Sequence, residues 1–154
     1  MKLTITLFLL LVSNAFAISQ KGDYKTVRES ITKLSCKTVD SLTVVKTNLE
    51  LIKLDTNLFD KNVDLYYRDL GWSYYRLHLY TKDTDLIRKS IDSYLKANVH
   101  KPNDPSTLWE LAHLNYIIQE CSTGLQFLEK FKSVTEKQYW REDQIKLMTR
   151  RCDN

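Results

Sequence analysis

The feature that most constrains this chain is a helical pattern that occurs twice between residues 64 and 137. In each copy, apolar or aromatic residues recur at steps of three and four, the spacing of one helix face. The first copy is marked by Tyr67, Leu70, Gly71, Tyr74, Ser90, Tyr94, Ala97 and Pro102, and the second by Leu108, Leu111, Ala112, Asn115, Gly124, Leu128 and Phe131. With 3 Gly, 2 Pro and no sustained alternation of β-branched residues, the chain predicts an all-α fold of antiparallel helical hairpins rather than a β sandwich or barrel.

These spacings resemble the tetratricopeptide repeat, a helical hairpin of about 34 residues. The resemblance implies a right-handed superhelical stack, in which each hairpin buries its apolar face against the next. The first copy departs from the family pattern because the step from Tyr74 to Ser90 is about seven residues too long, which predicts longer helices or a longer turn. The second copy has Asn115 where the family has an aromatic residue, and it lacks the proline. An ordinary helical bundle with coincidental spacing is the alternative.

The first 17 residues have the three parts of a secretory signal peptide. Lys2 precedes an apolar run over residues 7–12, and Ala15, Phe16 and Ala17 form the small-x-small cleavage pattern. The mature chain is expected to begin at Ile18 and to be exported to the bacterial periplasm or the extracellular space. An uncleaved membrane anchor is the alternative, but the apolar run is shorter than the roughly 20 residues that span a bilayer. We therefore expect no stable membrane insertion after cleavage.

The mature chain divides into two parts. Residues 18–61 predict an N-terminal helical hairpin or cap, and residues 56–61 predict its linker. Residues 62–154 hold the two repeat-like hairpins and a C-terminal capping helix over residues 139–151, as an array needs to hide its last apolar face. The formal net charge of +4 falls by one with the loss of Lys2, and the charges are mixed along the chain. This distribution predicts no nucleic-acid partner.

An odd number of cysteines, Cys36, Cys121 and Cys152, leaves at most one pair with a leftover, or no pair. Cys121 opens the last predicted repeat helix and Cys152 closes the terminal helix. If these helices run antiparallel, both cysteines lie at the same end, so Cys121–Cys152 is the predicted disulfide. Cys36 is interpreted as a buried apolar thiol, because no neighbour activates it.

The histidines give no sign of catalysis or metal binding. His78, His100 and His113 are scattered, and no CxxC spacing accompanies them. No Ser, Cys or carboxylate stands with them in a catalytic arrangement. We expect no enzyme activity, no catalytic residue, no metal and no cofactor.

The resemblance to the repeat family implies which residues face the concave groove. In that family the first helix of each hairpin lines the groove at fixed positions, which correspond here to Leu65, Arg68, Trp72, Tyr75, Arg76, Ser106, Trp109, His113, Tyr116 and Ile117. Arg, Trp and Tyr are the residues most enriched at binding hot spots. The predicted partner-binding residues are therefore Arg68, Trp72, Tyr75, Arg76, Trp109, His113 and Tyr116. The alternative is that Trp72 and Trp109 pack in the core.

Two functions from different classes follow. The first is an exported tetratricopeptide-like module that binds a protein or peptide through an aromatic and basic groove. The second is a small periplasmic immunity or inhibitor protein that neutralises a toxin or hydrolase, since such a protein needs only a complementary surface. Neither hypothesis names the partner.

Overall fold

The computed structural model describes residues 22–26, 28–29, 42, 45, 49 and 59–152. Within these residues the chain is mostly helical, which confirms the predicted all-α class. The predicted signal peptide, Cys36 and most of the predicted N-terminal hairpin lie outside the described residues.

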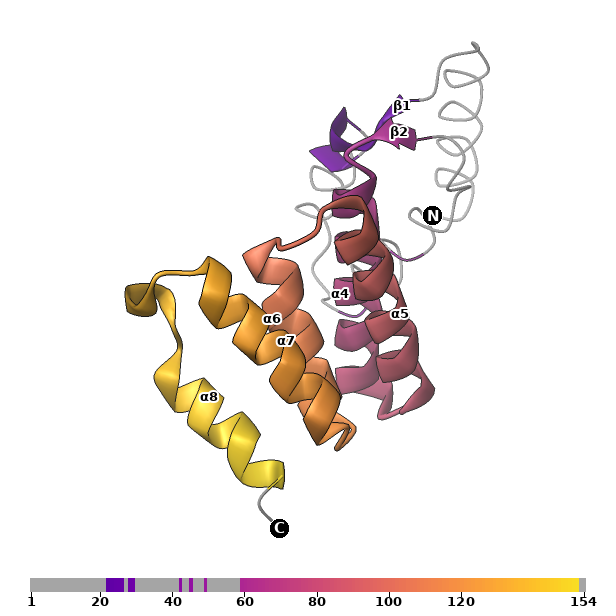
Figure 1. Cartoon of the computed structure of the whole chain (residues 1–154). Coiled ribbons are helices and arrows are strands. Elements are labelled where there is room, and N and C mark those ends of the chain that lie inside the picture. Colours follow the sequence, from indigo (N-terminus) through magenta and orange to yellow (C-terminus); the bar gives the residue numbers. More distant parts are fainter. Residues whose placement is uncertain are drawn as a thin grey trace.

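Two helical hairpins followed by a shorter helix form the body of the described chain, as Figure 1 shows. The elements are α4 (Val63–Thr81), α5 (Asp85–His100), α6 (Pro105–Ile117), α7 (Cys121–Val134), η2 (Lys137–Tyr139), α8 (Glu142–Thr149) and η3 (Arg150–Cys152). Helix α4 packs along α5, and α6 packs along α7. Helix α5 also contacts α6, so the two hairpins lie next to each other, and α8 packs back against α6.

The two helices of the first hairpin, α4 and α5, lie close to each other at Gly71. A Cβ atom on Gly71 would lie 2.7 Å from a ring carbon of Tyr94 and 3.2 Å from the carbonyl oxygen of Ser90. The Ser90 hydroxyl donates a buried hydrogen bond of 2.7 Å to the Gly71 carbonyl. Helices α4 and α5 therefore approach closely where the sequence places its small residues. The extra residues of the first copy lie in longer helices, since α4 has 19 residues and α5 has 16, against 13 in α6 and 14 in α7.

The second hairpin begins at the predicted Asp-Pro signal. Asp104 is the N-cap of α6, with Pro105 at the first helical position, and its carboxylate accepts from the Thr107 N–H at 3.0 Å. The same carboxylate lies 3.4 Å from Arg68 of α4 and 3.3 Å from Lys101. Burial alone would raise the pKa of Asp104, but the Thr107 hydrogen bonds and the charge of Arg68 outweigh it and lower this pKa. Asp104 thus starts α6 and also ties it to α4.

Helix α6 lies in the middle of the arrangement and is buried on most of its sides. Its buried residues are Thr107, Leu108, Trp109, Leu111, Ala112, Leu114, Asn115 and Tyr116. One apolar cluster joins Leu108 and Trp109 to Leu128 and Phe131 of α7 and to Met148 of α8. The terminal helix α8 therefore packs against the second hairpin and contributes Met148 to its core.

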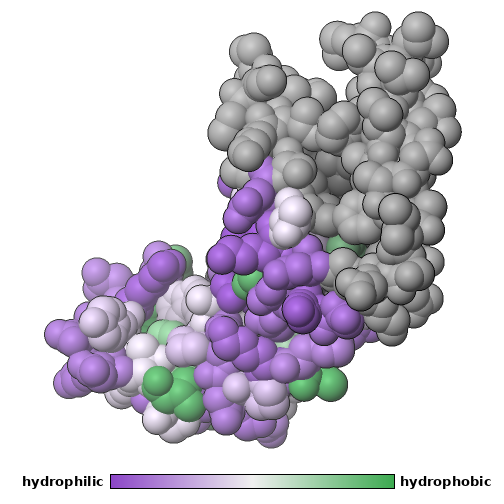
Figure 2. All heavy atoms as spheres, turned by 90° about the horizontal axis from the view of Figure 1, so that it is seen from above, coloured by the Kyte–Doolittle hydropathy of each residue, from purple (hydrophilic) through white to green (hydrophobic). Residues whose placement is uncertain are grey.

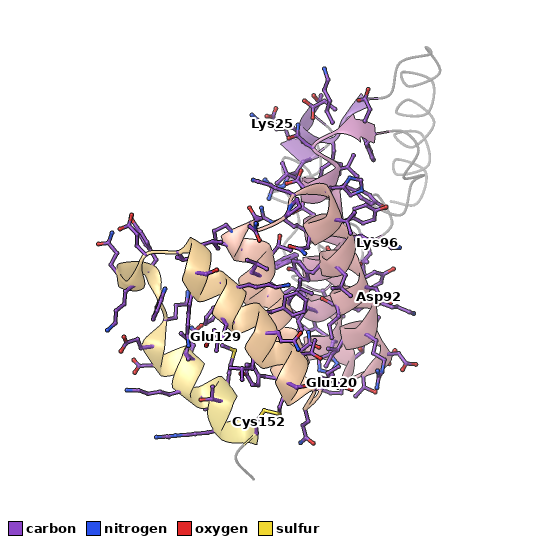
Figure 3. All side chains as sticks on the ribbon, in the orientation of Figure 1. Lys25, Asp92, Lys96, Glu120, Glu129 and Cys152 are labelled. Atoms are coloured by element: carbon purple, nitrogen blue, oxygen red, sulfur yellow. A yellow bond between two sulfur atoms is a disulfide. The ribbon has the colours of Figure 1, made fainter. Side chains whose placement is uncertain are left out.

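A disulfide bond joins Cys121, the first residue of α7, to Cys152 at the end of η3. The two Cα atoms are 5.8 Å apart, and the sulfur bond is visible beside the Cys152 label in Figure 3. This confirms the predicted pairing of Cys121 with Cys152. The bond fixes the C-terminal end of the chain to the start of α7.

The described N-terminal residues are tied to α4 by polar and aromatic contacts. The Tyr24 hydroxyl donates to Asp69 at 3.0 Å, and the Arg28 Nε donates to the same carboxylate at 2.6 Å. Burial and the charge of Asp69 raise the pKa of Tyr24 far above its usual range, which keeps this hydroxyl a donor. The Tyr24 ring also meets Tyr66 edge to face, with centroids 5.4 Å apart.

Two short parallel strands precede Tyr24 and α4, respectively, in the sequence. Strand β1 (Gly22–Asp23) pairs with β2 (Phe59–Lys61), with Gly22 opposite Phe59. The sequence predicts a linker over residues 56–61, and the structure differs for Phe59–Lys61. Such a short strand has too few residues to show an alternating pattern.

Candidate functional site

A hollow between the two hairpins collects five of the seven predicted partner-binding residues. It has a volume of about 280 Å³. The predicted residues that line it are Trp72, Tyr75, Arg76, Trp109 and His113. Four further residues complete the lining: Leu79, Glu110, Arg141 and Gln144. We call these nine residues the aromatic–basic hollow.

Three segments of the chain supply this lining. Helices α4 and α6 are the first helices of their hairpins, and each presents one face to the hollow. On α4 the side chains of Trp72, Tyr75, Arg76 and Leu79 recur at steps of three and four, which places them on one face. The third wall comes from the start of α8, where Arg141 is the N-cap and Gln144 lies in the first turn. The hollow therefore depends on the docking of α8 beside α6.

Both arginines of the hollow lie against indole rings. The Arg76 guanidinium carbon is 5.5 Å from the Trp72 ring centroid, and that of Arg141 is 5.6 Å from the Trp109 centroid. These are cation–π distances, so each ring holds a positive charge at the wall of the hollow. Trp72 is 43% exposed, whereas Trp109 is 8% exposed, so Trp72 offers the larger free surface.

An aromatic contact joins the two helices that line the hollow. The Tyr75 and His113 rings meet edge to face with centroids 5.6 Å apart, which links α4 to α6. His113 Nδ1 lies 3.9 Å from a Glu110 carboxylate oxygen, one helical turn away. Glu110 is the only carboxylate among the residues that line this hollow.

The two remaining predicted residues lie elsewhere. Tyr116 is 2% exposed, and its ring packs on Gly124 of α7, where a Cβ atom would be 3.2 Å from a ring carbon. It belongs to the core of the second hairpin because α6 is covered on that side by α7. Arg68 pairs with Asp104 and does not line the hollow. The sequence leaves open whether Trp109 packs in the core or faces the groove. It does both, since it is mostly buried and also lines the hollow.

Arg141 and Gln144 are site residues that sequence reasoning missed. Both precede or begin a short helix outside the two repeat-like copies, so no repeat position points to them. The only sign of such a residue in the sequence is the pair of Trp140 and Arg141, an aromatic and a basic residue in the connection before the last helix.

A larger adjoining hollow lies beyond Arg141. Its volume is about 390 Å³. Its walls include three aromatic residues, Trp109, Phe131 and Tyr139, together with Glu110 and Arg141. Trp109, Glu110 and Arg141 line both hollows. We call this the adjoining hollow.

The described residues give no further chemical centre. In the part of the chain that the structure describes, no group of three or more His, Cys, Asp or Glu residues is placed to hold a metal ion. No helix among the same residues is both long and apolar enough for a membrane span. The described surface is mainly hydrophilic when seen from above, with small separate hydrophobic areas (Figure 2).

Comparison with protein-family models, curated proteins and solved structures finds no match to this chain.

Proposed function

We propose that this chain is an exported helical-repeat protein of the tetratricopeptide kind, which binds a protein or peptide partner through the aromatic–basic hollow. The observation that carries the proposal is the convergence of Trp72, Tyr75, Arg76, Trp109 and His113 on one hollow. The repeat resemblance predicts these residues as groove positions, and they come from two helices that are distant in sequence. Aromatic and arginine side chains combine large contact area with polar groups, which suits a binding surface.

Two features of the hairpins support the repeat interpretation. Gly71 and Ser90 occupy the small positions of the repeat pattern, and they are in contact between α4 and α5. The first helices of both hairpins line the same hollow, as the concave face of the repeat family implies. Export rests on the predicted signal peptide over residues 1–17, and the disulfide is compatible with an oxidising compartment.

The proposal is tested with an affinity capture from the exported fraction, using the mature chain from Ile18 as bait. Trp72→Ala is compared with Tyr80→Ala, because both are aromatic residues of α4 with nearly equal exposure, 43% and 44%. Tyr80 does not line the hollow. A partner lost with Trp72→Ala and retained with Tyr80→Ala supports the proposal, provided that both variants keep the native helicity by circular dichroism.

Retention of the partner by the folded Trp72→Ala variant would contradict the proposed site. The identity of the captured protein decides between the two functional classes. If it is a toxin or hydrolase whose activity the native chain abolishes, the immunity or inhibitor function replaces the adaptor.

A further inference from the structure

The two arginines of the hollow contact aromatic rings, whereas two other described arginines pair with carboxylates. Arg28 pairs with Asp69 and Arg68 pairs with Asp104. Arg76 and Arg141 lie against Trp72 and Trp109 instead, and neither has an ion pair with a carboxylate among the described residues. Two permanent positive charges thus line one hollow, and neither forms an ion pair within the described part of the chain.

Arg76 also has an unused hydrogen-bond donor. Its Nε is shielded from solvent and has no hydrogen-bond partner among the described residues. A shielded N–H without an acceptor carries its full desolvation cost, which leaves the Arg76 guanidinium under-satisfied. The donor belongs to a planar guanidinium, whose paired N–H groups match the two oxygens of a carboxylate.

The sign and number of charges favour a monoanion. Arg76 and Arg141 contribute two positive charges, and Glu110 contributes one negative charge to the same walls. A carboxylate carries a single negative charge and neutralises the net charge of +1 on these walls, whereas a phosphate monoester carries close to two negative charges at neutral pH and leaves an excess of negative charge. A carboxylate is therefore the better complement to this hollow.

The adjoining hollow indicates what stands next to the carboxylate. Arg141 and Trp109 line both hollows, so a ligand held by Arg141 is in reach of the adjoining hollow. There it meets Phe131 and Tyr139, which are aromatic neighbours suited to another ring or a large apolar side chain. The Trp109 ring already packs on Phe131, with centroids 5.3 Å apart, which keeps this wall in place.

We infer that the aromatic–basic hollow binds the acidic side chain of an extended peptide segment between Arg76 and Arg141, while a nearby aromatic residue of that segment enters the adjoining hollow. The inference rests on the proposed function and specifies the partner chemistry of the same site. The ligand is the side chain of an Asp or Glu residue, and the aromatic residue lies close to it in the same segment.

The test uses short fluorescein-labelled peptides that are acetylated and amidated, so that the side chain is their only carboxylate. Each is a Gly/Ser segment with a central Glu-Phe, Gln-Phe or Glu-Ala, and the Glu-Phe pair is also made with one or two intervening glycines. Binding to the mature chain is followed by fluorescence anisotropy. The best Glu-Phe peptide is expected to bind about tenfold or more tightly than its Gln-Phe match, as charged hydrogen bonds imply. It should also bind more tightly than the Glu-Ala peptide.

The variants Arg76→Gln and Arg141→Gln assign the effect to the two arginines. Each should lower the affinity of the Glu-Phe peptide to that of the Gln-Phe peptide, and each should leave the Gln-Phe affinity unchanged. Arg88→Gln is the matched control, because Arg88 is an exposed residue of α5 that does not line either hollow. Circular dichroism of all three variants checks the fold.

Several results would overturn the inference. These are equal binding of the Glu-Phe and Gln-Phe peptides, absence of binding at millimolar peptide, or displacement by inorganic phosphate at concentrations where acetate has no effect. A failure of this inference can be distinguished from a failure of the proposed function. A captured protein that is lost with Trp72→Ala but retained with Arg76→Gln leaves the hollow as a binding site and refutes its acidic ligand.

Discussion

Removing the disulfide gives the most quantitative test of this structure. The variant Cys121→Ala/Cys152→Ala opens a loop with a sequence separation of 31 residues. The loop-closure relation for a cross-link of that span gives a loss of about 4 kcal/mol from the free energy of unfolding. For a chain of this size, that loss corresponds to a fall of roughly 8–15 °C in Tm. The double variant also leaves Cys36 as the only thiol, so no other disulfide can form within the chain.

The assay is urea unfolding followed by circular dichroism, with Ser122→Ala as the control. Ser122 is an exposed residue next to Cys121, and its replacement should change the free energy of unfolding by less than about 0.5 kcal/mol. The slope of the free energy with urea should rise in the double variant, because the unfolded chain without a cross-link exposes more surface. A loss below about 1 kcal/mol with an unchanged slope would refute the reasoning that the bond restricts the unfolded chain.

Three further predictions follow from single contacts. Gly71→Ala should lower the free energy of unfolding, measured in urea, by about 1 kcal/mol. The new methyl group overlaps the Tyr94 ring, and the cost of this overlap exceeds the gain in helix propensity. An increase in stability would contradict the close approach of the two helices. Ser90→Ala should cost about 1 kcal/mol by the same assay, because it removes the buried hydrogen bond to the Gly71 carbonyl, whereas Ser133→Ala, at an exposed helix position, should cost less. The lowered pKa of Asp104 means that its contribution to stability is complete above its unfolded pKa of about 3.9 and is lost as pH falls through the folded value. Urea unfolding from pH 7 downward should therefore show a shallower acid loss for Asp104→Asn than for the native chain, and identical slopes would contradict the assignment.

The parts of the fold that sequence predicted are those set by local chemistry. The start of α6 follows from Asp104 and Pro105, which combine an N-cap with a residue that needs no N–H. The closeness of α4 and α5 follows from Gly71, a residue that is costly inside a helix unless something packs against it. The cysteine pairing rests on a different argument, because antiparallel helices bring the start of α7 and the end of η3 to the same side.

The site residues that the sequence did not predict correctly depend on which sides of a helix are covered by other helices. Helix α6 is apolar on most of its circumference, so periodicity does not separate buried Tyr116 from wall-forming Trp109. Arg141 enters the hollow from a connection, where no period applies. The tie of Asp69 to Tyr24 and Arg28 joins residues more than forty positions apart, and no local pattern encodes such a contact.

The positions of the two long-range ties have a consequence for how the chain is made. The contact of Tyr24 with Asp69 closes a segment of 45 residues, and the disulfide closes a later segment of 31 residues. Neither segment encloses the other. When the chain emerges N-terminus first, Tyr24 and Asp69 are both available before Cys152, because they precede it in the sequence. The disulfide can therefore form after the first segment has closed, without opening the contact of Tyr24 with Asp69.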